Sequence, residues 1–407
     1  MNLFYLGGNL EILNILPIGD VRQEVTPSGR EGLKAPLPFS WIREDGTLTE
    51  APHTQIILYP KYPEIRFSGF LKGTAGGPNA LMTVRQAGRI LFFGITSDRR
   101  IIGWVTAPDS ALAGEIRALG DLPRTGVFLH VPLGVADTSR ERLLQKLHDI
   151  HALGWLSSQR LYGNGEIGVC IGSNCGGYTL KAQLGIIPNG RSEPDFEGWE
   201  IKGHTVNDFV RYTSGPLTLM TPEPTGGFYR AEGVEAFVRR YGYEDQLGRA
   251  DRLNFGGVHV HGIRHARTGL TLTFSGYIPG ENKFEAGGGF SLIDDAGNEA
   301  ATWHFAGLIQ HWNRKHSKAA YVPFQMRKDP AQEYVYGDRV RLGEDTDFLR
   351  FLKAMADGKV YYDPGIKVEG AATARPAVKR RSQFRIKSAD IAALYARFGA
   401  TSVNLNV

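Results

Sequence analysis

Short apolar runs separated by turn residues dominate the first third of the chain. Each run is rich in β-branched and aromatic residues and is bounded by Gly, Pro or Asp, which is typical of β-strands. The segments are 54–59, 64–71, 89–95, 100–106 and 126–131. We predict a single helix among them, at 110–119. The pattern indicates a β-rich N-terminal domain, folded as a compact barrel or sandwich.

The pattern changes near residue 138. Thr138 and Glu141 have the spacing of a capping box, and leucines and isoleucines at helical intervals follow from Leu143 to Leu153. Beyond this helix we predict strands at 198–202, 217–220, 270–277 and 289–293, and helices at 178–184, 233–241, 305–315, 345–356 and 388–398. This mixed order indicates an α/β or α+β domain with a central sheet. We therefore predict two domains, 1–137 and 138–407.

Composition excludes several classes of protein. Hydrophobic residues make up 42% of the 407 residues and charged residues 22%, which is ordinary for a globular chain. No apolar run approaches the length of a membrane-spanning helix, and the first residues lack the basic start of a signal peptide. Two cysteines, Cys170 and Cys175, are too few for a disulfide framework or a four-ligand zinc site. We expect both to be inert in a reducing cytoplasm.

The positive charge is unevenly distributed. The net charge is +5, but residues 1–137 carry 13 basic and 13 acidic side chains, so the excess lies in 138–407. The segment Gly370–Ala389 holds six basic residues and no acid: Arg375, Lys379, Arg380, Arg381, Arg385 and Lys387. A solvated loop and a surface that binds a phosphate backbone both explain such a run.

The most informative motif is Pro-Asp followed by Glu-x-Lys. Asp195, Glu200 and Lys202 lie within eight residues, and Glu200 and Lys202 are two apart on a predicted strand, so they share one face. Two converging carboxylates repel each other unless a cation lies between them, and hard oxygen ligands favour Mg²⁺. A neighbouring ammonium can hold the attacking water and neutralise charge on phosphorus. A surface ion pair is the alternative explanation.

The residues around this motif resemble the MvaI/BcnI-type restriction endonucleases, which are related to the mismatch-repair nickase MutH. The resemblance runs from Ser139 to the end of the chain. It includes the opening helix with Gly154-Trp155, the helix Thr179–Leu184, and the segments Thr221–Tyr229, Trp303–Val322 and Gly358–Lys387. It implies a restriction-endonuclease-like PD-(D/E)xK core with a central mixed sheet flanked by helices. It also implies Mg²⁺-dependent hydrolysis of DNA, with Asp195 and Glu200 as metal ligands and Lys202 as the catalytic lysine.

One position departs from the family pattern. The family has a glutamate on the preceding helix, 14 residues before the motif aspartate, where this chain has Lys181. Three explanations stay open. One metal held by Asp195 and Glu200 suffices, or Glu193, Glu197 or Glu166 replaces the missing ligand, or the domain cuts slowly and mainly binds.

Candidate DNA contacts follow from the resemblance and from charge. Carried over from the family, Arg385 lies at a base-contacting position, and the second such position falls near Lys367, where the family has arginine. We expect Arg375, Lys379, Arg380, Arg381 and Lys387 to meet phosphates. Lys315 and His316 are further candidates on the DNA side, and we expect Trp312 to be core. His259 and His261 suit DNA contact, a structural role or a metal site.

The sequence thus predicts a restriction-type, site-specific deoxyribonuclease that needs Mg²⁺ and cuts one strand at a time. The alternatives are a MutH-like nickase and a weakly active or non-cleaving DNA-binding module. Double-stranded DNA is the expected partner, with a cognate DNA methyltransferase in the same restriction–modification system. We expect a cytoplasmic monomer with no membrane association. For residues 1–137 we weigh a second DNA-binding domain, which senses an effector copy of the site, against a protein-contact or structural role.

Overall fold

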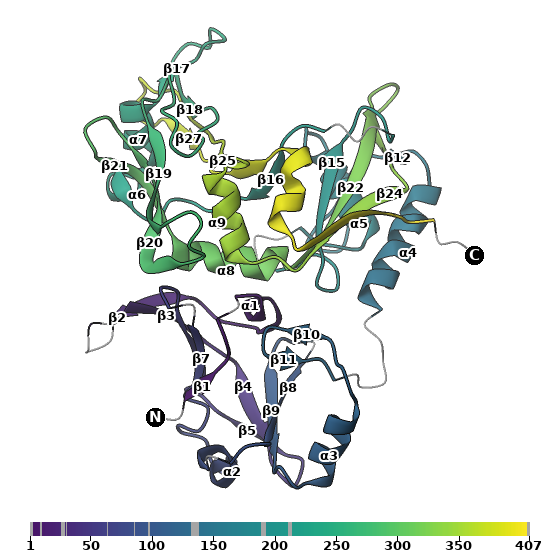
Figure 1. Cartoon of the computed structure of the whole chain (residues 1–407). Helices are drawn as coiled ribbons and strands as arrows, with labels where there is room; N and C mark the ends of the chain where they lie inside the picture. Colours follow the sequence, from purple (N-terminus) through teal and green to yellow (C-terminus); the bar gives the residue numbers. More distant parts are fainter. Residues whose placement is uncertain are drawn as a thin grey trace. The chain divides into compact units, whose positions relative to one another are not determined.

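The computed structural model describes residues 3–8, 10–25, 29, 31–62, 64–84, 86–96, 98–131, 138–188, 193–210 and 214–404. The backbone forms two compact units (Figure 1). Unit 1 comprises Met1–Gly134, Gly276–Gly288 and His304–Gln310, and unit 2 comprises the remainder. The predicted boundary between residues 137 and 138 adjoins 132–137, which lie outside the described residues.

Unit 1 is rich in β-strands. One sheet has the order β1-β7-β6-β3-β2 and a second has the order β5-β4-β9-β8. The strands are β1 (Leu3–Tyr5), β2 (Arg22–Val25), β3 (Glu31–Pro36), β4 (Phe39–Ile42), β5 (Leu48–Glu50), β6 (Gln55–Tyr59), β7 (Glu64–Ser68), β8 (Ile90–Ile95) and β9 (Ile101–Thr106). Aromatic side chains join the two sheets, with the rings of Phe39 and Phe67 5.4 Å apart and those of Phe67 and Phe93 5.2 Å apart.

Short helices and a two-stranded ribbon complete the part of residues 1–131 that the structure describes. They are α1 (Ile12–Ile15), α2 (Asn79–Thr83), α3 (Ala111–Ala118), β10 (Arg124–Thr125) and β11 (Phe128–Leu129). The side chain of Ser110 caps α3 by accepting from the backbone N–H of Ala113, so this helix begins where the sequence predicts.

Unit 2 is built on a mixed sheet that includes β12 (Leu156–Ser157), β15 (Glu200–Thr205), β22 (Lys318–Arg327), β23 (Glu333–Tyr336), β24 (Arg339–Glu344) and β29 (Arg397–Ser402). β22 is its centre. Ala319–Tyr321 pair in parallel with β15 and antiparallel with β24, while the end of β22 pairs with β23. The sheet is therefore mixed, as predicted, and β15 carries the Glu-x-Lys pair.

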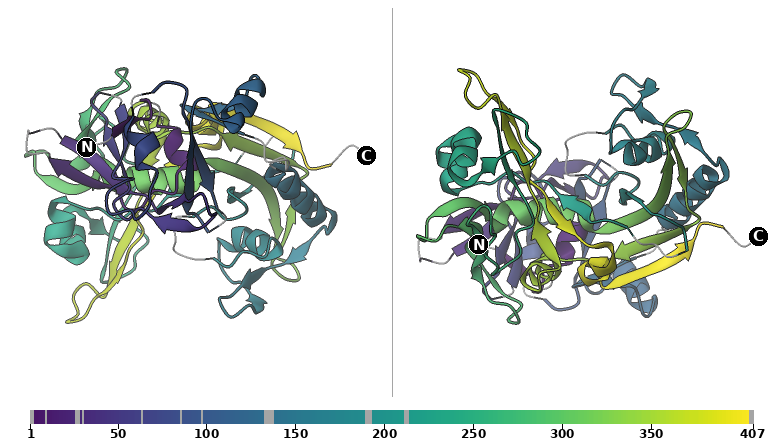
Figure 2. Two further views of the ribbon diagram at one scale, coloured as in Figure 1. Left: turned by 90° about the horizontal axis from the view of Figure 1, so that it is seen from below. Right: turned by 90° about the horizontal axis from the view of Figure 1, so that it is seen from above.

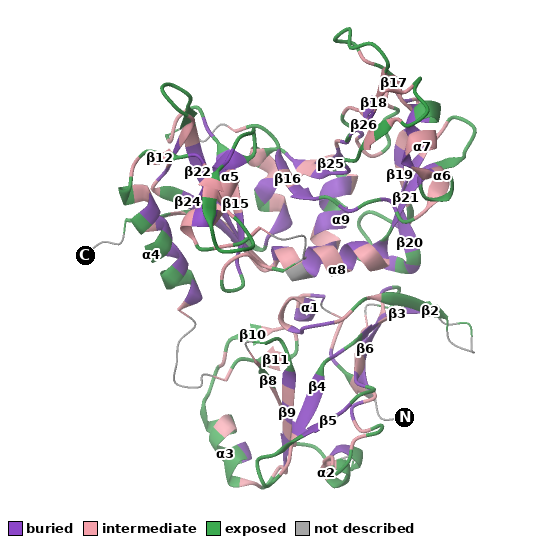
Figure 3. Cartoon of the chain, turned by 180° about the vertical axis from the view of Figure 1, so that it is seen from behind, coloured by how far each residue is buried: buried purple, intermediate pink, exposed green. Residues whose placement is uncertain are grey.

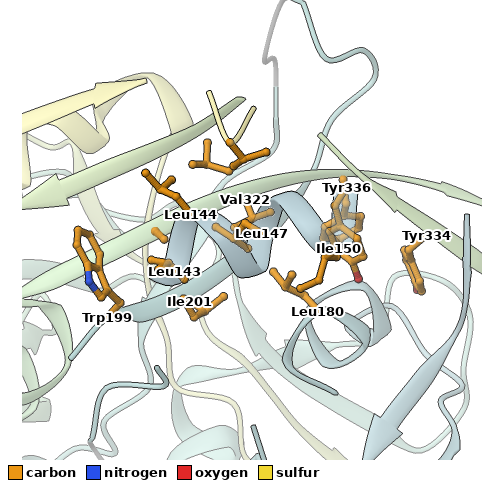
Figure 4. Close-up of a cluster of buried hydrophobic side chains, with 14 of the residues drawn as sticks. Leu143, Leu144, Leu147, Ile150, Leu180, Trp199, Ile201, Val322, Tyr334 and Tyr336 are labelled. Carbon is orange, nitrogen blue, oxygen red and sulfur yellow. The ribbon is translucent and has the colours of Figure 1, made fainter. Parts of the chain in front are cut away.

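Helices α4 (Ser139–Ala152) and α5 (Cys175–Gln183) contribute side chains to the hydrophobic core on this sheet. Leu143, Leu147 and Ile150 of α4 are each at most 3% exposed, and they pack with Ile201, Trp199 and Leu180 (Figure 4). The opposite face of α4 is exposed (Figure 3). The apolar residues whose helical spacing predicts this helix are therefore the residues that pack against the core.

The remaining elements form smaller sheets and helices, and those that include residues 276–288 and 304–310 belong partly to unit 1. The strand orders are β13-β14, β16-β28-β25, β17-β18-β26-β27 and β19-β20-β21. The strands are β13 (Gln159–Leu161), β14 (Ile167–Val169), β16 (Leu217–Met220), β17 (Tyr243–Glu244), β18 (Arg252–Gly256), β19 (Thr271–Tyr277), β20 (Phe284–Ile293), β21 (Glu299–His304), β25 (Val360–Tyr362), β26 (Gly365–Glu369), β27 (Ala377–Lys379) and β28 (Phe384–Ile386). The helices are α6 (Gly227–Ala231), α7 (Gly233–Tyr241), α8 (Phe305–His316), α9 (Phe348–Ala356) and the 3₁₀ helix η1 (Ser388–Leu394).

Several sequence expectations are wrong, among them that of a single helix in the first part of the chain, where α1 and α2 also form. The helix predicted at 388–398 is a 3₁₀ helix that ends at Leu394, and Arg397–Ser402 form β29, which pairs with β24. Cys170 and Cys175 are joined in a disulfide, because the loop between them brings their Cα atoms within 5.7 Å. Among the described residues, no helix is both long and apolar enough to cross a membrane.

Candidate active site

A tight turn positions the first carboxylate. Phe196 and Trp199 exchange both backbone hydrogen bonds, at 2.9 and 2.8 Å, across Glu197 and Gly198. Both central residues have positive φ, at 44° and 88°, and glycine meets that requirement at the second position. The chain therefore folds back on itself, and the backbone N–H of Ile201 donates to Asp195 Oδ2 at 3.0 Å.

Strand alternation positions the second carboxylate and the lysine. Trp199 and Ile201 enter the core, whereas Glu200 and Lys202 share the other face, with Lys202 Nζ 2.9 Å from Glu200 Oε1. Glu200 is only 1% exposed, and its Oε2 is buried without a hydrogen-bond partner among the described residues. Burial raises the pKa of the Glu200 carboxyl, and the Lys202 ammonium opposes that rise.

Lys181 lies where the family pattern has a glutamate. It projects from α5, and its Nζ is 2.7 Å from Asp195 Oδ1, so both Asp195 oxygens already accept hydrogen bonds. The pair is largely shielded, with 21% and 11% of the two side chains exposed. An ammonium therefore contacts the aspartate that the motif assigns to the metal.

The three glutamates considered as substitutes are all exposed, unlike the buried Glu200. Glu197 pairs with Arg142 at 2.6 Å, Glu166 accepts from Asn164 in an exposed turn, and Glu193 is exposed. In the described part of the chain, no three His, Cys, Asp or Glu side chains cluster as a metal site would require. Asp195 and Glu200 are accordingly the carboxylates available at this position.

The C-terminal end of α8 also reaches the site. Lys315 Nζ lies 3.6 Å from Glu200 Oε1, so this lysine, predicted on the DNA side, faces the buried carboxylate. His316 has no exposed surface, which is inconsistent with its predicted contact with DNA. Trp312 is fully buried, which confirms the core assignment.

The two other candidate histidines differ in burial. His259 is 0% exposed, with Nε2 2.9 Å from Thr268 Oγ1 and Nδ1 2.9 Å from the Gly257 carbonyl. Because no atom of its ring reaches the surface, we correct the expectation that it contacts DNA. His261 is half-buried against the ring of Phe274.

Burial of His259 predicts a loss of stability in acid. Burial lowers its pKa from 6.5 to about 3, and neighbouring His265 adds to that shift. Between those two pH values the unfolded chain binds the extra proton, so the free energy of unfolding falls as the pH falls, by up to about 1.4 kcal/mol per pH unit. Urea unfolding of the full chain between pH 8 and 4 should show a shallower slope for His259→Gln. At pH 8 the histidine is neutral in both the folded and the unfolded chain. The change in the free energy of unfolding that His259→Gln causes at this pH therefore serves as the control. Equal slopes would contradict this assignment.

The basic segment forms a hairpin and the strand that follows it. β26 and β27 pair with Lys367 opposite Lys379, and the hairpin projects from unit 2 (Figure 2). Glu369 lies between the two lysines, 3.2 Å from Lys367 Nζ and 2.8 Å from Lys379 Nζ, and their hydrogen bonds lower its pKa to about 2. This acid immediately precedes the uniformly basic run Gly370–Ala389, so the charge pattern of that run does not reveal it.

The other basic candidates fall into two groups. The guanidinium of Arg385 is held by Asp363, at 2.6 Å, and by the Pro216 carbonyl, at 2.7 Å, so two of its nitrogens are engaged within the protein. The exposed group consists of Arg375, Lys379, Arg380, Arg381 and Lys387. The exposed group is therefore the part of this segment that can meet a phosphate backbone directly.

Comparison with known proteins gives one clear result. The model of the MvaI/BcnI restriction endonuclease family matches residues 144–395. The chain is also similar to the restriction endonuclease MvaI in complex with its cognate DNA substrate, with 17% identity and a TM-score of 0.49, over 66% of this chain and 99% of that one. MvaI in the absence of DNA matches over the same shares with 15% identity and a TM-score of 0.35. The comparison with curated proteins found no match.

Proposed function

Because the chain belongs to the MvaI/BcnI restriction endonuclease family, we propose that it is an Mg²⁺-dependent, site-specific DNA endonuclease whose active site is Asp195, Glu200 and Lys202. One observation carries the proposal. A fully buried glutamate contacts a lysine at 2.9 Å and keeps its second oxygen without a partner among the described residues. Leaving a buried carboxylate oxygen unpaired is costly, which supports a cation as its missing partner.

The donor set fits one divalent cation. Asp195 and Glu200 supply hard oxygen ligands, and Mg²⁺ commonly takes its other ligands from water and substrate phosphate. When bound, the cation would stabilise the negative charge that develops on the phosphate during hydrolysis. The structure supplies no third carboxylate here among the residues that it describes, which favours the one-metal explanation.

Each side chain of the site would then have a separate role in the reaction. The Lys202 ammonium would hold the attacking water and donate to the developing charge, while Glu200 keeps this ammonium oriented. Asp195, fixed by the Ile201 N–H, would supply a carboxylate ligand to the cation beside Glu200. Lys315, beside the same glutamate, would add positive charge where the DNA backbone enters.

Plasmid cleavage separates the candidate activities. Purified full-length chain is incubated with supercoiled plasmid and Mg²⁺. Discrete linear fragments support a restriction enzyme, and sequencing of their ends gives the recognition site. Open circles alone support a nickase, and unchanged plasmid that is retarded on a gel supports a module that binds without cutting.

A second candidate, weak cleavage with DNA binding as the main activity, is favoured by the Lys181–Asp195 ion pair. A lysine cannot ligate Mg²⁺, and its ammonium competes with the cation for Asp195. Under this alternative, cutting requires unusually high Mg²⁺, while DNA affinity is ordinary.

The exposed arginines of the basic segment should contribute electrostatic affinity. Arg380 and Arg381 are both exposed. If each neutralises one phosphate, Arg380→Ala/Arg381→Ala should make the slope of log K against log salt shallower by about 1.8. Fluorescence anisotropy with a duplex in Ca²⁺ measures this slope. Lys353→Ala, an exposed lysine of α9, is the control and should leave it unchanged. An unchanged slope in the double variant would show that Arg380 and Arg381 do not contact the DNA phosphates.

For residues 1–137 we propose a second DNA-binding domain that responds to an effector copy of the site. A cleft of about 850 Å³ in unit 1 is lined by both basic and acidic side chains, including Arg22, Lys34, Lys72, Asp20 and Glu24. Lys34 and Glu24 pair with each other, which leaves Arg22 and Lys72 as the cations to test. Adding a specific duplex in trans should speed plasmid cleavage by the natural chain and not by Arg22→Ala/Lys72→Ala. Equal stimulation of both would assign the domain another role.

The proposed endonuclease function also implies a monomer that works in the cytoplasm with a cognate methyltransferase.

A further inference from the structure

His316 is a buried histidine next to the catalytic lysine. It ends α8, has no exposed surface, and its Nε2 lies 3.1 Å from the Leu219 carbonyl oxygen. The Lys202 ammonium donates to the same oxygen at 3.2 Å. One carbonyl oxygen of β16 thus accepts from both side chains.

The chemistry of the contact fixes the tautomer. A carbonyl oxygen only accepts, so His316 Nε2 must carry the proton. Burial, reinforced by the Lys202 and Lys315 charges, lowers the pKa of the ring well below its ordinary value, so the ring is neutral. Its Nδ1 is then a bare acceptor, and it has no partner among the described residues.

Packing fixes the position of the ring. Trp312 stacks on His316 with centroids 4.4 Å apart and an interplanar angle of 20°. Trp312 is itself held by its Nε1–H, which donates to Thr346 Oγ1 at 3.2 Å, and by contact with Phe351. The imidazole therefore donates in a fixed direction, set by core residues of α8 and α9.

We propose that His316 is a positioning residue for Lys202, acting through the Leu219 carbonyl. Lys202 has two acceptors in the described structure, Glu200 Oε1 on its own strand and Leu219 O on β16. Without a second donor, that carbonyl can rotate with its peptide, and the ammonium loses one of its two fixed contacts. When the His316 hydrogen bond holds the Leu219 carbonyl in place, the third N–H of Lys202 keeps a constant direction for contact with the reacting phosphate. This inference rests on the proposed nuclease activity.

The variants separate the hydrogen bond from the packing. His316→Phe keeps an aromatic ring on Trp312 and removes the donor. His316→Gln keeps an amide donor near the position of Nε2. We expect His316→Phe to lower the single-turnover cleavage rate at saturating DNA about tenfold to a hundredfold. His316→Gln should stay within about threefold of the natural chain, and neither should change the Kd for duplex DNA in Ca²⁺ more than about twofold.

A double-mutant cycle identifies Lys202 as the residue through which His316 acts. On a Lys202→Ala background, His316→Phe should cause no further loss, because the group that it positions is gone. Melting temperatures of all variants are measured alongside. If His316→Phe does not fold, His316→Asn replaces it, since its shorter amide cannot reach the Leu219 carbonyl.

Each outcome decides the inference. A donor-less variant that cuts like the natural chain overturns it. Equal losses in His316→Phe and His316→Gln, or additive losses with Lys202→Ala, show a purely structural role and also overturn it. A natural chain that binds DNA but does not cut overturns the proposed function itself, and this inference with it.

Discussion

Lys202→Ala is expected to lower the single-turnover rate of DNA cleavage by roughly 10³-fold. The Lys202 side chain is 18% exposed, and its ammonium is held by Glu200 and the Leu219 carbonyl, so it has one N–H left for water or phosphate. Lys315 approaches the same glutamate oxygen from another element, α8, and at 3.6 Å it lies farther from that oxygen than Lys202 does. Quenched-flow or manual single-turnover assays on a labelled duplex measure the rate.

Two controls accompany this variant. Lys353→Ala removes an exposed lysine of α9 that pairs with Asp357, and this variant should cut at the natural rate. Binding of duplex DNA in Ca²⁺ should be nearly the same for Lys202→Ala and the natural chain. A loss of less than tenfold in rate would mean that Lys202 is not the catalytic lysine.

Lys181→Glu is expected to tighten metal binding by about tenfold to a hundredfold. The substitution removes the ammonium that contacts Asp195 Oδ1 and adds a third carboxylate to the site. Without a cation the three carboxylates repel one another, so the melting temperature should fall in EDTA and recover when Mg²⁺ or Mn²⁺ is added. Titration calorimetry with Mn²⁺ in the absence of DNA measures the affinity directly.

The matched controls separate charge from ligation. Lys181→Met removes the competing ammonium without adding a ligand and should give an intermediate affinity. Lys146→Glu makes the same charge change on the exposed face of α4 and should leave metal binding unaltered. If Lys181→Glu binds Mn²⁺ no better than the natural chain, Lys181 does not compete with the cation.

Local patterns predicted the elements that carry the site. The leucine stripe of α4 and the alternation in β15 are properties of neighbouring residues, and the structure confirms both. The return of Asp195 to the side of Glu200 also follows from a local turn, because Gly198 allows the positive φ that the turn requires.

Features that depend on distant residues could not be predicted in this way. The residues before Arg397 have a helical pattern, which led to the helix predicted at 388–398. Arg397–Ser402 instead pair with β24, which lies more than fifty residues earlier in the chain. The ring of His259 packs near that of Tyr362, and His316 contacts the Leu219 carbonyl, so both histidines are surrounded by segments distant in sequence that no local pattern reveals. The ion pair between Lys181 and Asp195 joins a helix and a turn. That the Lys181 ammonium contacts Asp195 becomes visible only once the helix and the turn are both located in the structure.

The most direct test of the central claim is plasmid cleavage by the natural chain and by Glu200→Gln, with Mg²⁺ and with EDTA. Glutamine keeps the shape of Glu200 and removes its charge, so the buried position stays filled while the cation loses a ligand. The natural chain should cut in Mg²⁺ and not in EDTA. Glu200→Gln should leave the plasmid intact while still binding duplex DNA. Cutting by Glu200→Gln at the natural rate, or by the natural chain in EDTA, would contradict the assignment of this site.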